Sequence, residues 1–226
     1  TDIRSIVLTG EGRAFCVGAD LKEHGAATRT ELEKLEYLQL GNDVCERIYK
    51  HPKPIIAAVN GFALGAGAEM SCSADFIVMK AGAQIGFPEI SIGTHVGGGV
   101  TGILPRLVGL AKARELIMTG RRIDGSEAER IGLATRVFAD EDFDQGVADF
   151  AAEIGAKAPY SVRFAKENLN DDGRDYTSRL ISELDALRTC MLTEDWQGDR
   201  RLREKAHSRF QGPVAAAPST NGKFKS

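Results

Sequence analysis

The sequence predicts an α/β fold followed by a helical C-terminal part. Strand-like and helix-like runs alternate from residue 3 to residue 80, whereas residues 142–207 carry mainly helical patterns. A chain of 226 residues that is 42% hydrophobic and 27% charged can bury one substantial core. These observations favour a soluble globular α/β protein.

The first strand is expected at residues 3–9, and a long helix follows at residues 30–49. Thr30 and Glu33 have the spacing of a capping box, in which a hydroxyl and a carboxylate satisfy free backbone donors. Prolines after residue 51 end this helix. Its apolar residues recur at helical spacing and are expected to form its buried face: Leu32, Leu35, Leu38 and Cys45.

The next predicted elements alternate between strand and helix. Residues 55–59 are continuously apolar, as in a strand buried on both faces. Residues 65–73 suit a short helix, and residues 75–80 suit another strand. Ser126 and Glu129 have capping-box spacing, so a helix is expected to start there. Further helices are expected at residues 142–158, 160–170, 174–192 and 194–207.

These patterns divide the chain into three segments. They are an α/β core at residues 3–140, a helical C-terminal region at residues 141–210 and a flexible tail at residues 211–226, which has little to bury. The chain lacks an initiator Met and opens almost directly on a strand-like run. We therefore expect that a segment precedes Thr1.

Charge and cysteine content narrow the classes of function. With 29 basic and 32 acidic residues, the net charge of -3 gives no general attraction to nucleic acid or to anionic membranes. Cys16, Cys45, Cys72 and Cys190 are widely scattered, which argues against a disulfide framework or a structural zinc ion. The sequence has no apolar run of bilayer length and no signal-peptide pattern. We expect a cytoplasmic protein with no metal, nucleic-acid or membrane partner.

Two glutamates stand in unusual surroundings. Glu69 closes the segment Gly65-Ala-Gly-Ala-Glu69, and Glu89 closes Gln84-Ile-Gly-Phe-Pro-Glu89. A carboxylate among small apolar residues is costly to bury unless it is protonated, hydrogen-bonded or used in chemistry. The pair therefore suggests acid/base catalysis. Spacing alone nevertheless favours ordinary structural roles, with Glu69 stabilised by a helix dipole and Glu89 exposed on a loop.

The glycine-rich segments have two interpretations. The pattern Gly97-x-Gly99-x-x-Gly102 matches a dinucleotide fingerprint, but Pro105 comes three residues after Gly102, where an uninterrupted helix should follow. By contrast, residues 65–67 at a helix start can present backbone N–H groups to an anion, and a second loop could add a donor near Ala19. Two such donors would form an oxyanion hole. Tight backbone packing remains the alternative explanation of these glycines.

Several longer motifs occur in a fixed order along the chain. They are Arg13-Ala-Phe-Cys-Val-Gly-Ala-Asp20, Pro54-Ile-Ile-Ala-Ala-Val-Asn-Gly61, Ala63-Leu-Gly-Ala-Gly-Ala-Glu69, Phe87-Pro-Glu89 and Leu104-Pro-Arg-Leu-Val-Gly109. Together they resemble the crotonase superfamily, and within it the enoyl-CoA hydratase/isomerase family, from about Ile3 to about Phe210. The resemblance implies a crotonase-like (ββα)n spiral core and a helical C-terminal oligomerisation region. It also implies that the family's first strand and helix are missing before Thr1.

The resemblance implies an enoyl-CoA hydratase, which adds water across the 2,3 double bond of a trans-2-enoyl-CoA. Glu69 and Glu89 would hold one water, one taking its proton and the other giving a proton to the α-carbon. The backbone N–H groups of Ala19 and Ala66 would form the oxyanion hole for the thioester oxygen. The positions implied to bind substrate or CoA are Arg13, Ala14, Phe15, Val17, Gly18, Asp20, Leu21, Lys22, Gly65, Gly67, Pro88, Thr94, His95, Gly97 and Gly98.

The same resemblance implies an acyl-CoA thioester substrate, a role in fatty acid metabolism, and a homotrimer or a hexamer built as a dimer of trimers. Trp196 and Phe210 would take part in that assembly. No cofactor is implied, because coenzyme A is part of the substrate.

The stretch Thr94-His95-Val96 departs from the family pattern and leaves the acyl group open. His95 is interpreted as a packed loop histidine rather than a base. Two other functions stay open. One is another crotonase reaction, such as double-bond isomerisation or thioester hydrolysis, and the other is a non-catalytic scaffold.

Overall fold

The computed structural model describes residues 2–20, 30–171, 173, 175–193 and 195–196. Contacts divide the chain into two compact units, Thr1–Ile154 and Gly155–Ser226. Leu21, Lys22, Phe210, most of the helix expected at residues 194–207 (residue 194 and residues 197–207) and the tail expected at residues 211–226 lie outside the described residues.

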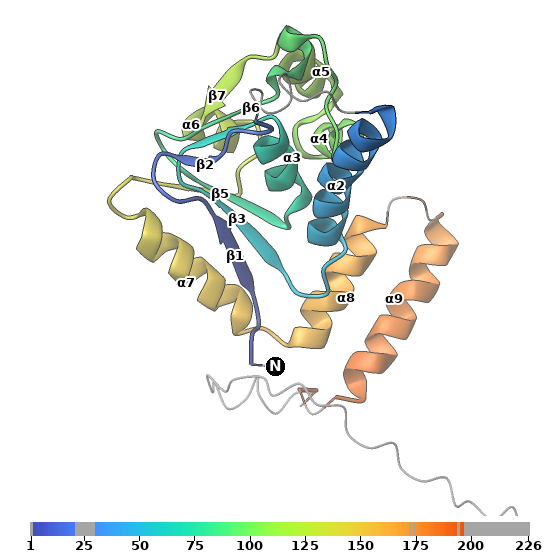
Figure 1. The fold of residues 1–226 in the computed structure, drawn as a ribbon. Helices are drawn as coiled ribbons and strands as arrows, with labels where there is room; N and C mark the ends of the chain where they lie inside the picture. Colours follow the sequence, from blue (N-terminus) through green and yellow to red (C-terminus); the bar gives the residue numbers. More distant parts are fainter. Residues whose placement is uncertain (1, 21–29, 172, 174, 194, 197–226) are drawn as a thin grey trace, which may run out of the picture. The chain divides into compact units, whose positions relative to one another are not determined.

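Two four-stranded sheets form the described framework of the first unit (Figure 1). The first sheet has the order β1-β3-β5-β8, and all its strands are parallel. The second has the order β2-β4-β6-β7, in which β7 runs antiparallel to β6. The strands are β1 (Ile6–Thr9), β2 (Ala14–Cys16), β3 (Ile55–Val59), β4 (Phe62–Leu64), β5 (Phe76–Lys80), β6 (Gln84–Gly86), β7 (Arg122–Asp124) and β8 (Arg136–Phe138).

Successive strands alternate between these two sheets. β1 and β2, then β3 and β4, then β5 and β6 each place one strand in the first sheet and the next strand in the second. A helix follows each such pair along the chain. This repeating strand–strand–helix turn confirms the predicted spiral α/β core.

β3 is buried along its whole length because both of its faces are covered. Ile56 and Ala58 pack in one apolar cluster with residues of α7 (Phe143–Gly155), which lies along one side of the first sheet in Figure 1. Ala57 and Val59 belong to a larger cluster shared with the second sheet and the helices near it. Since successive side chains of a strand point to opposite faces, a continuous apolar run is what this position requires.

The long helix α2 (Glu31–Tyr49) begins where the sequence predicts. Thr30 caps it, and the capping box between Thr30 and Glu33 is formed in both directions. The prediction of its buried face is wrong, however, because Cys45 and Ile48 are its only buried residues. The three leucines expected to be buried are 59–64% exposed: Leu32, Leu35 and Leu38.

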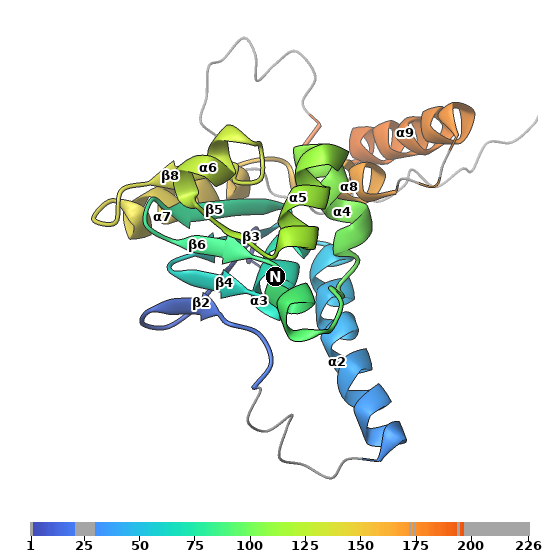
Figure 2. The same ribbon diagram turned by 90° about the horizontal axis from the view of Figure 1, so that it is seen from above.

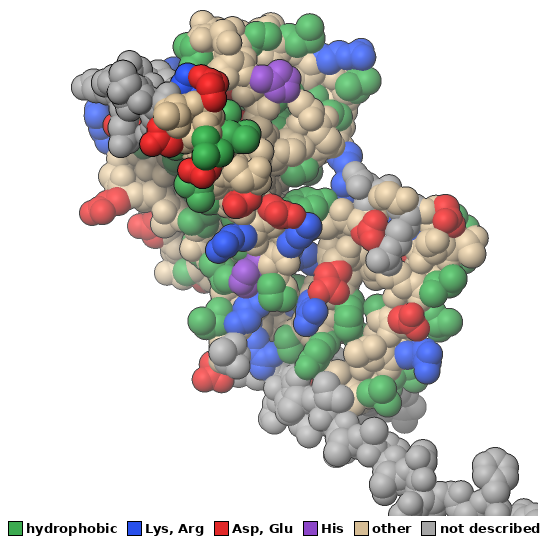
Figure 3. All heavy atoms as spheres, turned by 45° about the vertical axis from the view of Figure 1, so that its right-hand side comes forward, with side chains coloured by type: hydrophobic (Ala, Val, Ile, Leu, Met, Phe, Trp, Pro, Cys, Tyr) green, Lys and Arg blue, Asp and Glu red, His purple; other side chains and the backbone are tan. Residues whose placement is uncertain are grey.

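The leucines are exposed because of where α2 lies relative to the sheets. Helical spacing shows which residues share a face, but it does not show what covers that face. The N-terminal part of α2 extends beyond the sheets (Figure 2), so only its C-terminal end reaches the core. Figure 3 turns the right-hand side of Figure 1 forward and shows hydrophobic side chains (green) among acidic ones (red) there.

The remaining helices of the first unit are α3 (Ala66–Ser73), the 3-10 helix η1 (Pro88–Ile92), α4 (Val100–Val108), α5 (Leu110–Thr119) and α6 (Gly125–Arg130). The cap expected at Ser126 is wrong. Asp124 is the N-cap of α6, and its carboxylate accepts the N–H of Glu127 at 2.8 Å. Aspartate is as good a cap as serine, and here it directly ends β7.

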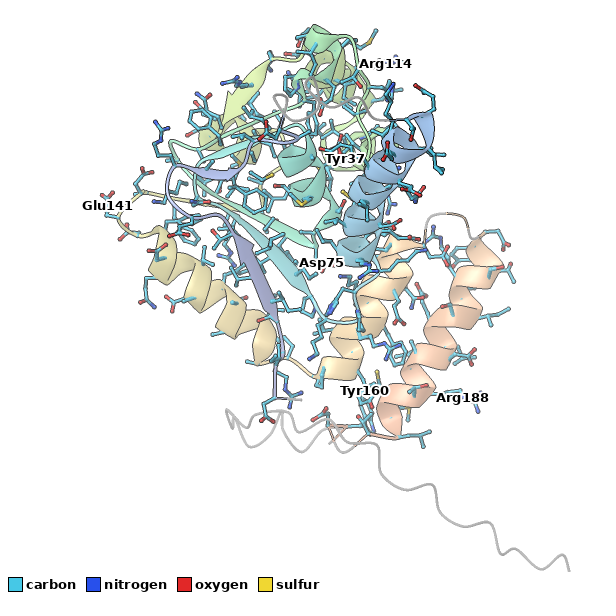
Figure 4. The ribbon with its side chains drawn as sticks, viewed as in Figure 1. Tyr37, Asp75, Arg114, Glu141, Tyr160 and Arg188 are labelled. Carbon is cyan, nitrogen blue, oxygen red and sulfur yellow. The ribbon has the colours of Figure 1, made fainter. Side chains whose placement is uncertain are left out.

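The described part of the second unit is a pair of helices, α8 (Pro159–Asn170) and α9 (Tyr176–Met191). Ser182 of α9 donates to the Asn168 side chain of α8 at 2.5 Å. Figure 4 labels Tyr160 on α8 and Arg188 on α9. Several large apolar residues of α9 are exposed: Leu180, Ile181, Leu184, Leu187 and Met191. No helix within the described residues is long and apolar enough to cross a bilayer.

Candidate active site

Three neighbouring parallel strands end at one edge of the second sheet, and the predicted site residues follow them. Ala19 comes shortly after β2, Ala66 shortly after β4 and Glu89 shortly after β6. The strands are adjacent in the order β2-β4-β6. Because parallel strands present their carboxyl ends at the same edge, three segments distant in sequence meet there.

The segment after β2 packs against the N-terminus of α3. Gly18 has a φ of +93°, and a Cβ at this position would lie 3.5 Å from the Ala66 nitrogen. Ala66 is the first residue of α3, so the helix itself offers no acceptor for its N–H. The structure therefore brings the segment that carries Ala19 next to the N–H of Ala66.

Backbone atoms make the contact between these segments. A Cβ at Gly67 would lie 2.0 Å from the Cys16 carbonyl oxygen, and one at Gly61 would lie 2.2 Å from the Arg13 carbonyl oxygen. Real Cβ atoms do not come within 3.0 Å of such atoms. Glycine is therefore required at both positions, which supports the packing explanation of these glycines.

Glu89 is 8% exposed, and neither of its carboxylate oxygens has a hydrogen-bond partner among the described residues. The interpretation of Glu89 as an exposed loop carboxylate is therefore wrong. Burial has the largest effect and raises its pKa, while the backbone N–H of Glu89 itself lowers the pKa by less. The nearby negative charge of Glu69 also raises the pKa, and His95 lowers it slightly. Gly65 lies close to this carboxylate, since a Cβ there would be 3.2 Å from Oε1.

Glu69 lies in the first turn of α3 and is partly buried. Its side chain reaches the glycine segment that precedes α4, where Oε1 accepts the N–H of Gly97 at 2.6 Å. The two glutamates are thus near neighbours with different surroundings, one hydrogen-bonded and one without a partner. Two carboxyl groups in unlike environments are suited to giving and taking a proton.

The other predicted binding residues near β2 differ in their exposure. Phe15 is 9% exposed and its side chain belongs to the core, so only its backbone could meet a ligand. Ala14 and Gly18 are partly buried. The exposed members of this group are Arg13, Val17, Ala19 and Asp20.

The remaining predicted residues lie between β6 and α4. Pro88 is partly buried and begins η1, while Thr94 and His95 are exposed. His95 Nδ1 lies 2.7 Å from the carbonyl oxygen of Val96. Because a carbonyl can only accept, Nδ1 carries the proton in this contact.

Two residues of α2 that border the site were missed by sequence reasoning. Asn42 Oδ1 accepts the N–H of Gly98 at 3.0 Å. Cys45 also faces Gly98, since a Cβ there would lie 2.7 Å from its Sγ, and burial raises the pKa of Cys45. No motif marks these positions, and the available signal is an asparagine within an otherwise apolar helical stripe. Among the described residues, no group of three His, Cys, Asp or Glu side chains is placed to hold a metal ion.

Comparisons with known proteins identify similar sequences and structures. The family model described as enoyl-CoA hydratase/isomerase matches residues 1–212. The chain is 36% identical to the short-chain-enoyl-CoA hydratase of Clostridium acetobutylicum, over 86% of this chain and 75% of that protein. It is also 36% identical to the crotonyl-CoA hydratase of Syntrophomonas wolfei, over 92% of this chain and 80% of that protein.

A crystal structure of an enoyl-CoA hydratase from Bacillus anthracis superposes with a TM-score of 0.87 at 35% identity. The match covers 93% of this chain and 82% of that one. Fold, family model and relatives agree over nearly the whole length. The chain therefore belongs to the enoyl-CoA hydratase/isomerase family of the crotonase superfamily.

Proposed function

We propose that this protein is an enoyl-CoA hydratase, which adds water across the 2,3 double bond of a trans-2-enoyl-CoA to give a 3-hydroxyacyl-CoA. The observation that carries this proposal is Glu89, a buried carboxylate without a hydrogen-bond partner among the described residues, close to a second glutamate. An unpartnered carboxylate is costly to bury, and a substrate water would supply the missing partner. The hydratase relatives support the same reaction.

In the proposed reaction, Glu69 and Glu89 share one water molecule. The raised pKa of Glu89 favours its protonated form, so Glu89 is the acid that gives a proton to the α-carbon. Glu69, held by the N–H of Gly97, takes a proton from the water as the water oxygen bonds to the β-carbon. One proton enters the substrate and one leaves the water, so the two glutamates exchange protonation states in each addition.

The thioester carbonyl gains negative charge as the β-carbon is attacked. We place its oxygen at the backbone N–H groups of Ala19 and Ala66, which come from segments that meet at the end of β2 and the start of α3. Removing one donor of this kind from an enzyme typically costs about 10²–10³-fold in kcat. We also propose that the residues around these donors that are predicted to bind CoA do so.

The test is direct. Incubation with crotonyl-CoA should consume the conjugated thioester and yield 3-hydroxybutyryl-CoA, whereas Glu69→Gln and Glu89→Gln should each lower kcat by about 10²-fold or more. Glu129→Gln, an exposed glutamate of α6, is the matched control and should keep wild-type activity. Appearance of a shifted alkene or of free CoA would show isomerisation or thioester hydrolysis instead. Failure to bind any CoA thioester would favour a scaffold role.

We also propose a homotrimer or a dimer of trimers that works in cytoplasmic fatty acid metabolism. The exposed apolar residues of α9 support self-association, and the unpaired cysteines suit a reducing compartment. The proposed reaction needs no cofactor, because water supplies the hydroxyl group and Glu89 supplies the proton. Light scattering after size-exclusion chromatography measures the assembly, and a monomeric mass would contradict it.

A further inference from the structure

The glycine segment 97–99 approaches Glu69 without side chains of its own to anchor it. Gly98 and Gly99 both have positive φ values, so the backbone here is in a region that few other residues adopt. Glycines also leave the unfolded and locally opened chain the greatest freedom. At its C-terminal end the segment is held by α4, where the Gly97 carbonyl accepts the N–H of Val100 at 3.1 Å. The direction of the Gly97 and Gly98 N–H groups depends in addition on the contacts that other elements make with them.

The holding contact comes from α2. Asn42 Oδ1 accepts the N–H of Gly98 at 3.0 Å, while the neighbouring N–H of Gly97 donates to Glu69 Oε1 at 2.6 Å. A Cβ at Gly97 would lie 3.2 Å from Asn42 Oδ1 and 3.4 Å from Glu69 Oε2. One amide oxygen and one carboxylate thus lie against the same glycine from two different helices.

We propose that Asn42 is a positioning residue for hydration. It holds the segment 97–99 against α2, so that the N–H of Gly97 keeps the Glu69 carboxylate aimed at the substrate water. Asn42 acts through the backbone and touches no reacting atom in this scheme. The inference rests on the proposed function, because it assigns to Asn42 an effect on the step that Glu69 carries out.

The central variant is Asn42→Leu, which keeps a similar size and removes the acceptor. We expect kcat for crotonyl-CoA to fall by about tenfold to a hundredfold with KM little changed, since a displacement of about 1 Å can cost about 10²-fold in rate. Amide hydrogen exchange of the segment 97–99, measured by mass spectrometry on the free protein, should become faster. Asn42→Asp retains an acceptor oxygen and should restore slow exchange and a kcat above that of Asn42→Leu.

Gln39→Leu is the matched control. Gln39 lies one turn earlier on α2 and donates to Asp43 within that helix, so the same change of side chain leaves the glycine segment untouched. It should keep wild-type kcat and wild-type exchange at the segment 97–99.

Unchanged amide hydrogen exchange of the segment 97–99 in Asn42→Leu would show that Asn42 does not hold this segment. Faster exchange with unchanged kcat would overturn the positioning role. A rise in KM as large as the fall in kcat would show a substrate-binding role instead. An inactive wild-type protein would overturn the proposed function, and the exchange measurement would still decide whether Asn42 holds the segment.

Discussion

Replacing Gly67 with alanine should push β2 away from α3 and slow the reaction. The new Cβ would lie 2.0 Å from the carbonyl oxygen of Cys16 and 2.7 Å from its carbonyl carbon. Contacts of this kind do not fall below 3.0 Å, so the backbones must separate by about 1 Å or more. Ala66 directly precedes Gly67 and Ala19 follows Cys16 closely, so the same movement separates the two proposed oxyanion donors.

Two effects of stated size follow. A displacement of about 1 Å at a catalytic group can cost about 10²-fold, so kcat/KM for crotonyl-CoA should fall by about that factor. Overpacking of this kind lowers the free energy of unfolding by about 1–3 kcal/mol. The first is measured from the loss of thioester conjugation in a spectrophotometer, and the second from urea denaturation.

Gly102→Ala provides the matched control. Gly102 lies in α4, and a Cβ there would meet nothing within 4 Å. This change should raise the free energy of unfolding by about 0.5–1 kcal/mol and leave kcat/KM unaltered. Wild-type kcat/KM in Gly67→Ala would refute the argument that the spacing between β2 and α3 determines the positions of the Ala19 and Ala66 N–H groups. Wild-type stability in the same variant would refute the steric contact itself.

Three further predictions concern pH, capping and thiol reactivity. Because the pKa of Glu89 is raised on folding, its contribution favours the folded state below the unfolded pKa and is lost as the pH rises through the folded pKa. Between the unfolded and the folded pKa of Glu89, the wild-type protein should lose this contribution to the free energy of unfolding as the pH rises, and Glu89→Gln should remove that loss. An unchanged pH dependence, measured by urea titrations, would contradict this. Asp124→Ala should lower the free energy of unfolding by about 1 kcal/mol, whereas Ser126→Ala should change it little. A larger loss in Ser126→Ala than in Asp124→Ala would show that Ser126 is the cap. Burial raises the pKa of Cys72 to about 12, so iodoacetamide should leave this thiol unmodified in the native protein and label it only after unfolding, as followed by mass spectrometry.

Sequence reasoning worked best where the signal is local. The bounds of α2 follow from a capping box and two prolines, and the residues of β3 follow from a five-residue apolar run. It failed where the burial of a residue depends on which other elements pack against it. The exposed leucines of α2 share a helical face as expected, but the sequence does not show that the helix extends past the sheets.

The same distinction applies to the candidate site. Glu69, Glu89, Ala19 and Ala66 could be proposed because each belongs to a recognisable motif. Asn42 could not, because an asparagine in an apolar helical stripe does not show which distant segment it contacts, and its partner Gly98 lies 56 residues further along the chain. The burial of Glu89 likewise depends on packing around the end of β6, and its local sequence alone suggested an exposed loop.

The strand order β2-β4-β6 separates two tasks along one sheet edge. The proposed oxyanion donors and the proposed base Glu69 follow β2 and β4, while the proposed proton donor Glu89 follows β6. A change confined to η1 after β6 would therefore remove the proposed proton donor while the proposed oxyanion donors, which follow the two neighbouring strands, stay in place.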